Sequence, residues 1–181
     1  IKNNSKVILD YAHTPDALKY TLKSIKEQFS HSSISIVFGC GGDRDKDKRP
    51  TMGKIANQYC NKIFLTDDNP RYENPKKIRK QIKKKIVKSK LFEIASREKA
   101  IKVAIENLNS GDILLVAGKG HEIYQEYRGK KKIFSDKKYI LKEINSKNKK
   151  LFKNWKANIL HEQCNLNSVS KDLKINKASI N

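Results

Sequence analysis

The stretch Ile-Leu-Leu-Val-Ala at residues 113–117 is the most hydrophobic run of this 181-residue chain. It contains no polar residue at alternate positions, which distinguishes it from a strand with one face in water. Such a continuous apolar run is typical of a strand that is buried on both faces of a parallel sheet. The run therefore predicts a sheet that is covered by helices on both sides.

The segments before this run alternate short apolar stretches with helical patterns. Strands are expected at residues 7–9, 34–38, 63–66 and 92–94, and helices at 15–29, 51–59, 75–88 and 97–108. Thr14, followed by Pro15, and Ser96 are the expected N-caps of the first and the last of these helices. Strands that alternate with helices of this length indicate βαβ units. We therefore predict a doubly wound α/β fold with a mostly parallel sheet and helices on both faces.

Two more elements are expected after the buried run, and then the composition changes. Residues 127–134 should form a hairpin near an edge of the sheet that turns at residues 128–130, and residues 136–144 a helix. Beyond Ser146 the sequence is rich in lysine and asparagine, with no clear periodicity except a short helix around residues 155–160. We predict one domain at residues 1–146 and a linker or tail at residues 147–181.

The formal net charge is +21, from 40 Lys and Arg residues against 19 Asp and Glu residues. Only six of the basic residues are arginines, whereas nucleic-acid interfaces favour arginine for its planar, bidentate guanidinium group. Abundant Asn and Ile accompany the lysines, as an AT-rich coding sequence would produce. We interpret the charge as general lysine enrichment, and a nucleic-acid-binding module that uses residues 76–90 is the alternative of a different class.

The chain shows no sign of a membrane or secreted protein. No run approaches the roughly 18 apolar residues of a membrane-spanning helix, and no signal-peptide pattern begins at Ile1. Cys40, Cys60 and Cys164 are odd in number and widely spaced, which is typical of reduced thiols. We expect a cytoplasmic protein without a membrane partner.

Four polar loops follow the predicted strands, at residues 10–16, 39–50, 67–71 and 118–122. In an open parallel sheet, ligands bind beyond the carboxyl ends of the strands, so these loops predict one shared site. The loops lack the spacing of a dinucleotide-binding motif, a P-loop or a calcium loop, and the histidines lack metal-ligand spacing. A self-contained ATPase or metalloenzyme is therefore not expected.

The charged residues of these loops carry both signs. Arginines can bind carboxylates bidentately, and carboxylates can accept hydrogen bonds from ammonium groups. This mixture suits a zwitterionic amino acid, although the charges of residues 43–47 are also compatible with a solvated loop. The candidate residues are Arg44, Arg49 and Arg71 on the basic side, and Asp10, Asp68 and Glu122 on the acidic side.

Four segments together resemble the C-terminal domain of the Mur ligase family, over about residues 1–146. They are DYAHTPDAL, VFGCGGDRDKDKRPTMGKIA, LTDDNPRYENP and GKGHEIYQ, in this order and spacing. The resemblance implies a Rossmann-like α/β domain and an ATP-dependent ligase of peptidoglycan synthesis. The segment DNPR resembles the signature of members that add meso-diaminopimelate, whereas lysine-adding members, the alternative within the family, lack this arginine.

The resemblance also implies roles for individual residues. Arg71 would bind the distal carboxylate of diaminopimelate, Arg44 another carboxylate and Glu122 an ammonium group. The full set of implied diaminopimelate contacts is Arg44, Asp68, Asn69, Pro70, Arg71, Gly118 and Glu122, and the residues implied to face the nucleotide are Asp10, Tyr11 and His13.

The implied reaction is amide synthesis through an acyl phosphate. ATP phosphorylates a carboxylate of UDP-N-acetylmuramoyl-L-alanyl-D-glutamate, and an amino group of diaminopimelate, held in line, attacks it. The resemblance places ATP and magnesium mainly on domains outside this chain, so we expect no catalytic residue and no metal ligand here, and no turnover by the chain alone. Residues 172–181 resemble the start of another ligase of the family; a fused second ligase and a disordered extension both stay open for the tail.

Overall fold

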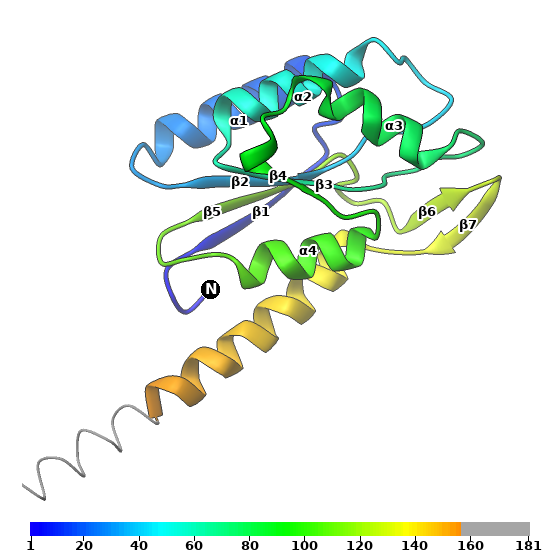
Figure 1. The fold of residues 1–181 in the computed structure, drawn as a ribbon. Coiled ribbons are helices and arrows are strands. Elements are labelled where there is room, and N and C mark those ends of the chain that lie inside the picture. Colours follow the sequence, from blue (N-terminus) through cyan, green and yellow to red (C-terminus); the bar gives the residue numbers. More distant parts are fainter. Residues whose placement is uncertain (157–181) are drawn as a thin grey trace, which may run out of the picture.

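The computed structural model describes residues 1–156 and contains one sheet of five parallel strands (Figure 1). The order across the sheet is β1 (Lys6–Asp10), β5 (Ile113–Ala117), β2 (Ile34–Phe38), β3 (Lys62–Leu65) and β4 (Leu91–Glu93). The hydrophobic run that forms β5 pairs with β1 on one side and with β2 on the other. The predicted parallel α/β sheet is therefore confirmed.

Helices cover both faces of this sheet (Figure 1). One layer consists of α1 (Pro15–Gln28), α2 (Lys48–Tyr59) and α3 (Pro75–Ile82), and the other of α4 (Arg97–Glu106) and the helix at residues 136–156. In β2, Ile36 and Phe38 point into the first layer and Val37 into the second. Because successive side chains of a strand point to opposite faces, burial on both sides explains why the central strands are apolar at almost every position.

Two helices begin where the sequence signals predict. Thr14 Oγ1 accepts a hydrogen bond from the Ala17 amide at 3.3 Å, and Pro15 occupies the first turn of α1. Ser96 Oγ accepts from the Lys99 amide at 3.3 Å at the start of α4. Each hydroxyl satisfies an amide that has no partner within its helix, so these starts could be predicted from neighbouring residues alone.

The basic segment departs from the predicted helix at residues 75–88. Helix α3 ends at Ile82, and short 3-10 turns follow at η1 (Lys83–Lys85) and η2 (Lys88–Lys90). The end of α2 holds this segment, because the Val87 amide and Lys90 Nζ donate to Asn57 at 2.9 and 3.1 Å. These contacts fix the segment between the end of α3 and the edge strand β4.

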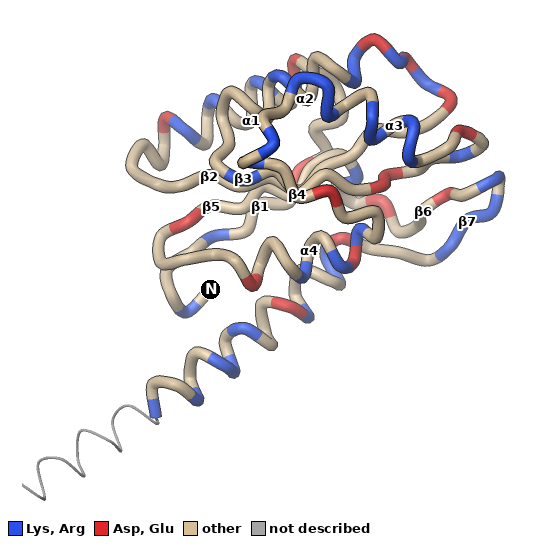
Figure 2. The backbone as a smooth tube through the Cα atoms, in the orientation of Figure 1, with Lys and Arg blue, Asp and Glu red and all other residues tan. Residues whose placement is uncertain are grey.

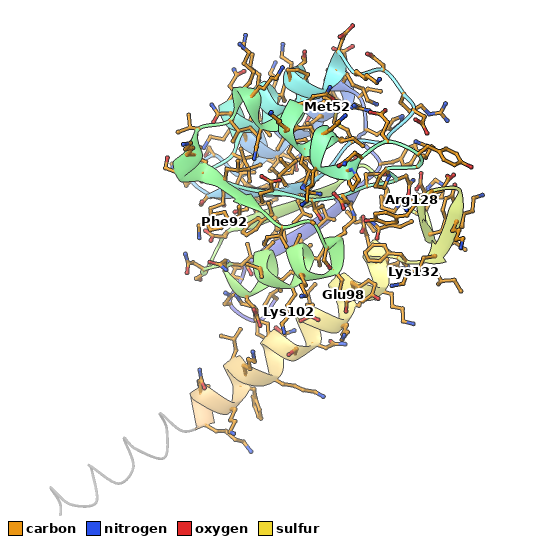
Figure 3. The ribbon with its side chains drawn as sticks, turned by 45° about the vertical axis from the view of Figure 1, so that its right-hand side comes forward. Met52, Phe92, Glu98, Lys102, Arg128 and Lys132 are labelled. Atoms are coloured by element: carbon orange, nitrogen blue, oxygen red, sulfur yellow. The ribbon has the colours of Figure 1, made fainter. Side chains whose placement is uncertain are left out.

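The hairpin and the last helix also differ from the prediction in extent. The hairpin consists of β6 (Tyr124–Tyr127) and β7 (Lys130–Ile133), so it begins three residues earlier than predicted. Arg128 and Gly129 both have positive φ at its tip, and Figure 3 shows Arg128 and Lys132 on this hairpin, which extends from the body of the domain. The last helix, predicted at residues 136–144, continues without a break to residue 156. The remainder of the tail, with Cys164 and residues 172–181, lies outside the described residues.

No helix among residues 1–156 is both long and apolar enough to cross a membrane. Cys40 and Cys60 are buried and form no disulfide. Burial raises the pKa of each thiol to about 12, so both are protonated and unreactive at neutral pH.

Candidate functional site

A cavity of about 300 Å³ lies at the carboxyl edge of the sheet, where the loops after β1, β2, β3 and β5 meet. Its wall contains eight of the ten residues that the family resemblance implies to contact a ligand: Tyr11, His13, Arg44, Asp68, Asn69, Arg71, Gly118 and Glu122. The parallel sheet brings them together because it directs all four loops to the same edge.

Asp10 and Pro70 are absent from the cavity wall. Asp10 Oδ1 accepts a hydrogen bond from the Ala12 amide at 2.6 Å and so shapes the loop that carries Tyr11. The carbonyl group of Pro70 lies against Gly42, where any Cβ atom would overlap with it. In this structure both residues shape the loops, and their ligand contacts stay predictions.

The loop at residues 39–47 is tied to the loop that follows β3. The Gly42 amide donates to the carbonyl oxygen of Asn69 at 2.9 Å. Asp43 has a φ of 51° and is held from two sides, since its amide donates to Glu73 Oε1 at 2.6 Å and its carboxylate accepts from the Tyr72 amide at 3.1 Å. Asp43 is thus part of the loop framework, while Arg44 beside it lines the cavity.

Arg49 is not available to a ligand, contrary to its place among the candidate arginines. Its side chain is completely buried and donates to both oxygens of Glu73 at 2.8 and 3.0 Å, to Gln81 Oε1 at 2.6 Å and to the Gly41 carbonyl at 3.0 Å. Helix α2 begins three residues before the predicted start, which places Arg49 in its first turn, beneath the loop. Arg49 therefore supports the cavity from outside it.

The Arg49–Glu73 pair predicts a pH dependence of stability. Hydrogen bonds from Arg49 lower the pKa of Glu73 from 4.5 to about 2. Since the folded-state pKa is depressed, ionised Glu73 stabilises the fold above about pH 4.5, and this contribution is lost as the pH falls towards 2. Urea unfolding of the wild type and of Glu73→Gln should therefore give free energies that differ most at pH 7, approach each other below pH 4.5 and converge as the pH falls through about 2. A difference that stays constant from pH 7 to pH 2.5 would show that the ion pair is not its source.

Arg71 is fixed at the cavity wall by its backbone and by two side-chain contacts. Its φ is 50°, and its backbone pairs with the hairpin, with the Arg71 amide donating to the Glu126 carbonyl at 3.1 Å. Nη1 donates to the Gly42 carbonyl at 2.7 Å, and Nε lies 3.7 Å from Glu126 Oε2. Nη2 makes no hydrogen bond within residues 1–156, so one side of the guanidinium group remains free for a ligand.

A buried lysine lies at the centre of the acidic part of the site. Lys119 Nζ donates to Asn69 Oδ1 at 3.0 Å and to Glu122 Oε2 at 2.8 Å, and it lies 4.0 Å from Asp68 Oδ1. Burial alone would raise the pKa of Glu122, but the hydrogen bonds from Lys119 and Asn69 outweigh it and lower this pKa. Glu122 is therefore ionised at neutral pH. The sequence showed Lys119 only as part of GKGHE, which fails the P-loop pattern, and assigned it no role.

The β6–β7 hairpin clamps the segment at residues 67–71. Gln125 Nε2 donates to the carbonyl oxygens of Asp67 and Asp68 at 3.2 and 2.9 Å, and the Tyr127 hydroxyl donates to Asp67 Oδ2 at 3.2 Å. The Glu126 amide adds a bond to Asn69 Oδ1 at 3.1 Å. The hairpin was predicted only as an edge element, because no local signal shows that its side chains reach back by more than 50 residues.

Six further residues line the cavity that the sequence did not single out as ligand contacts: Thr14, Gly39, Cys40, Gly41, Asp45 and Lys48. Lys48 Nζ donates to the His13 carbonyl at 2.9 Å and joins the first two loops. Within residues 1–156, no group of three or more His, Cys, Asp and Glu side chains is arranged to hold a metal ion. The cavity thus offers fixed charges of both signs, a chemistry suited to binding an amino acid.

Comparison with known proteins identifies a family and several relatives. Residues 1–120 match the model of the family described as Mur ligase, glutamate ligase domain. Proteins named UDP-N-acetylmuramoyl-L-alanyl-D-glutamate--2,6-diaminopimelate ligase are 52% identical over 143 residues in Rickettsia rickettsii and 50% identical over 149 residues in Buchnera aphidicola subsp. Baizongia pistaciae. These matches cover 78% and 82% of this chain, but the chain spans only 30% and 29% of the relatives. A solved structure of a ligase with the same name superposes with a TM-score of 0.75 at 43% identity, over 80% of this chain and 30% of that one.

Proposed function

The chain belongs to the Mur ligase family, and from this premise we propose that it is the amino-acid-binding domain of a ligase that adds meso-diaminopimelate. The second substrate would be UDP-N-acetylmuramoyl-L-alanyl-D-glutamate, as the names of the relatives state for those proteins. The observation that carries the proposal is the cavity itself, which is lined by two arginines and two carboxylates, Arg44, Arg71, Asp68 and Glu122. Residues 1–146 would form this domain, although the last helix crosses that boundary.

The charges of the cavity match those of the proposed ligand. Diaminopimelate has two carboxylates and two ammonium groups, whereas lysine lacks the distal carboxylate. Two arginines can bind the two carboxylates, with Arg71 on the distal one, and Asp68 and Glu122 can accept from ammonium groups. A volume of about 300 Å³ is sufficient for a ligand of this size. Lysine would leave Arg71 Nη2 without the carboxylate that diaminopimelate offers it, so Arg71 favours the diaminopimelate-adding activity over the lysine-adding one.

The contribution of this domain to the reaction is to orient the amine. An amide forms when the free amino group of the bound amino acid attacks the carbonyl carbon of an acyl phosphate and displaces inorganic phosphate, and a fixed position of the amine accelerates this step. Asp68, Asn69, Glu122 and the two arginines would hold that position. Asp10, Tyr11 and His13, in the first loop, would face the nucleotide of the assembled enzyme.

ATP and magnesium are assigned mainly to other parts of the enzyme. When ATP is bound, it supplies the phosphoryl group that activates the carboxylate of the nucleotide-linked dipeptide. The chain spans only 30% and 29% of the two relatives, so we expect no turnover by the chain alone and assign no step with magnesium to it.

A chimera tests the proposal directly. Residues 1–146 of this chain replace the matching segment of the Rickettsia rickettsii relative, and ADP release is measured with meso-diaminopimelate or with L-lysine in the presence of the nucleotide dipeptide. Activity that depends on meso-diaminopimelate and is at least tenfold lower with lysine supports the proposal. A folded chimera that uses lysine equally well would overturn the substrate assignment. Isothermal titration of the 181-residue chain with both amino acids provides the matching binding data.

The nucleic-acid alternative depends on the basic segment at residues 76–90, whose α3 part shows several Lys and Arg positions in Figure 2. Ile78, Ile82 and Ile86 of this segment are buried in the core, so the segment has the apolar inner side of an ordinary amphipathic surface element. We expect the chain to show no binding to duplex DNA at physiological salt. Salt-sensitive binding under these conditions would restore this alternative.

A further inference from the structure

Lys119 is a completely buried cation at the edge of the cavity, and it lies behind the wall, since Glu122 and Asn69 line the cavity and Lys119 does not. We propose that Lys119 is a positioning residue: it aligns the Glu122 carboxylate and the Asn69 amide so that Glu122 Oε1 receives the ammonium group of the bound amino acid. This inference rests on the proposed function and assigns a role that the family signature residues do not cover.

The geometry allows only one orientation of the two aligned side chains. Lys119 Nζ can only donate, so the Asn69 atom that it contacts at 3.0 Å must be the oxygen. The Asn69 amide nitrogen then donates to Glu122 Oε2 at 2.9 Å. The Glu126 amide, which donates to the same Asn69 oxygen at 3.1 Å, requires the same orientation. Lys119 and the Glu126 amide thus together determine which end of the Asn69 amide faces Glu122.

The same contacts leave one oxygen of Glu122 for a ligand. Oε2 accepts from both Lys119 and Asn69, while no donor within residues 1–156 contacts Oε1. Glu122 lines the cavity and its side chain is 22% exposed. Its free oxygen can therefore accept from an ammonium group without breaking either existing bond.

The burial of Lys119 argues for a function beyond packing. Its side chain is completely buried, and burying a cation is unfavourable unless its partners compensate for lost hydration. Its partners Asn69, Glu122 and Asp68 are all residues of the cavity wall. The polar contacts of Lys119 therefore all stabilise side chains of the ligand site, which supports a role in positioning them.

The first test measures Glu122 without any ligand. Carbon-13 NMR of the 181-residue chain follows the Glu122 carboxyl group through a pH titration, with Glu122→Gln used to assign the signal. In the wild type its midpoint should lie below the ordinary glutamate value of 4.5, and in Lys119→Met it should move upwards, because the main opposing hydrogen bond is lost. Lys131→Met is the matched control. Lys119 Nζ lies 5.7 Å from the centre of the Tyr124 ring, and Nζ of the exposed Lys131 lies 4.5 Å from it, so this variant removes a lysine beside the same ring and should leave the midpoint unchanged. An unshifted midpoint in folded Lys119→Met would overturn the proposal.

The second test measures binding of meso-diaminopimelate by titration calorimetry at several pH values. Lys119→Met should bind roughly tenfold to a hundredfold more weakly than wild type, the effect of a lost hydrogen bond to a charged group. As the pH is lowered, the affinity of Lys119→Met should also begin to fall at a higher pH than the affinity of the wild type. A purely structural role of Lys119 would not cause this difference. Lys131→Met should retain both the affinity and the pH profile.

A double variant covers the case in which Lys119→Met does not fold. Lys119→Met with Glu122→Gln leaves no unpaired carboxylate at Glu122, and its affinity should lie within about twofold of Glu122→Gln alone, because Lys119 acts through Glu122. A further tenfold loss in the double variant would overturn the proposal. The results also distinguish the proposed function from the positioning role. If the titration midpoint of Glu122 is lowered only when Lys119 is present, but the wild type does not bind meso-diaminopimelate, the proposed function alone is refuted. Wild-type binding with equal binding by folded Lys119→Met would refute the positioning role alone.

Discussion

Arg71→Ala is expected to weaken binding of meso-diaminopimelate by about 2–3 kcal/mol, which corresponds to thirtyfold to more than a hundredfold in Kd. The side chain is 23% exposed, so the contact with a ligand carboxylate would be largely shielded from water. Without the guanidinium group, that carboxylate loses its partner within the cavity. Isothermal titration of the chain and KM of the chimera measure the effect.

Two controls separate recognition from loop structure. Arg71 also donates to the Gly42 carbonyl, so Arg71→Ala could disturb the loop and weaken every ligand. L-Lysine has no distal carboxylate, and its affinity should change by less than about threefold if Arg71 acts on that group. Arg71→Lys keeps the charge but not the bidentate geometry and should recover only part of the loss. Equal losses for both amino acids would remove Arg71 as the selectivity residue.

Arg97→Met is expected to destabilise the fold strongly. Arg97 and Asp136 are both completely buried, with Nε and Nη2 of Arg97 donating to the two carboxylate oxygens at 2.8 and 2.6 Å. Nη2 also donates to the Ala117 carbonyl at 2.9 Å, at the end of β5. The substitution leaves Asp136 buried without a counter-charge, and removal of one partner from such a pair costs about 3–5 kcal/mol of unfolding free energy.

Urea unfolding of the 181-residue chain at pH 7 tests this expectation. The matched control is Lys23→Met, which removes a lysine from the exposed pair Lys23–Glu27 and should cost less than about 0.5 kcal/mol. Arg97→Met with Asp136→Leu removes both charges and should be more stable than Arg97→Met alone. An Arg97→Met variant that loses less than about 1 kcal/mol would mean that the buried pair is not important for the stability of the fold.

The elements whose signals are local could be predicted from the sequence. The apolar run of β5, the alternation of strands and helices, and the caps at Thr14 and Ser96 are all confirmed. The predicted helices at residues 75–88 and 136–144 were wrong in length. The first one ends at Ile82, and contacts with Asn57 hold the segment that follows it. The second continues to residue 156, across a change of composition that does not interrupt the helix.

The location of the site could be predicted from the sequence, but the residues that form it could be predicted only in part. The sequence by itself determined that four charged loops meet at one edge of a parallel sheet, because strand direction follows from the βαβ pattern. Only the tertiary structure decided which charges face the cavity. Arg49 is buried in an ion pair with Glu73, 24 residues away, whereas Nη2 of Arg71 makes no hydrogen bond within residues 1–156. It also placed Lys119 behind Asn69, 50 residues away. The physical reason is that periodicity and capping depend on neighbouring residues, whereas the partner of a buried charge depends on which distant segments the fold brings into contact.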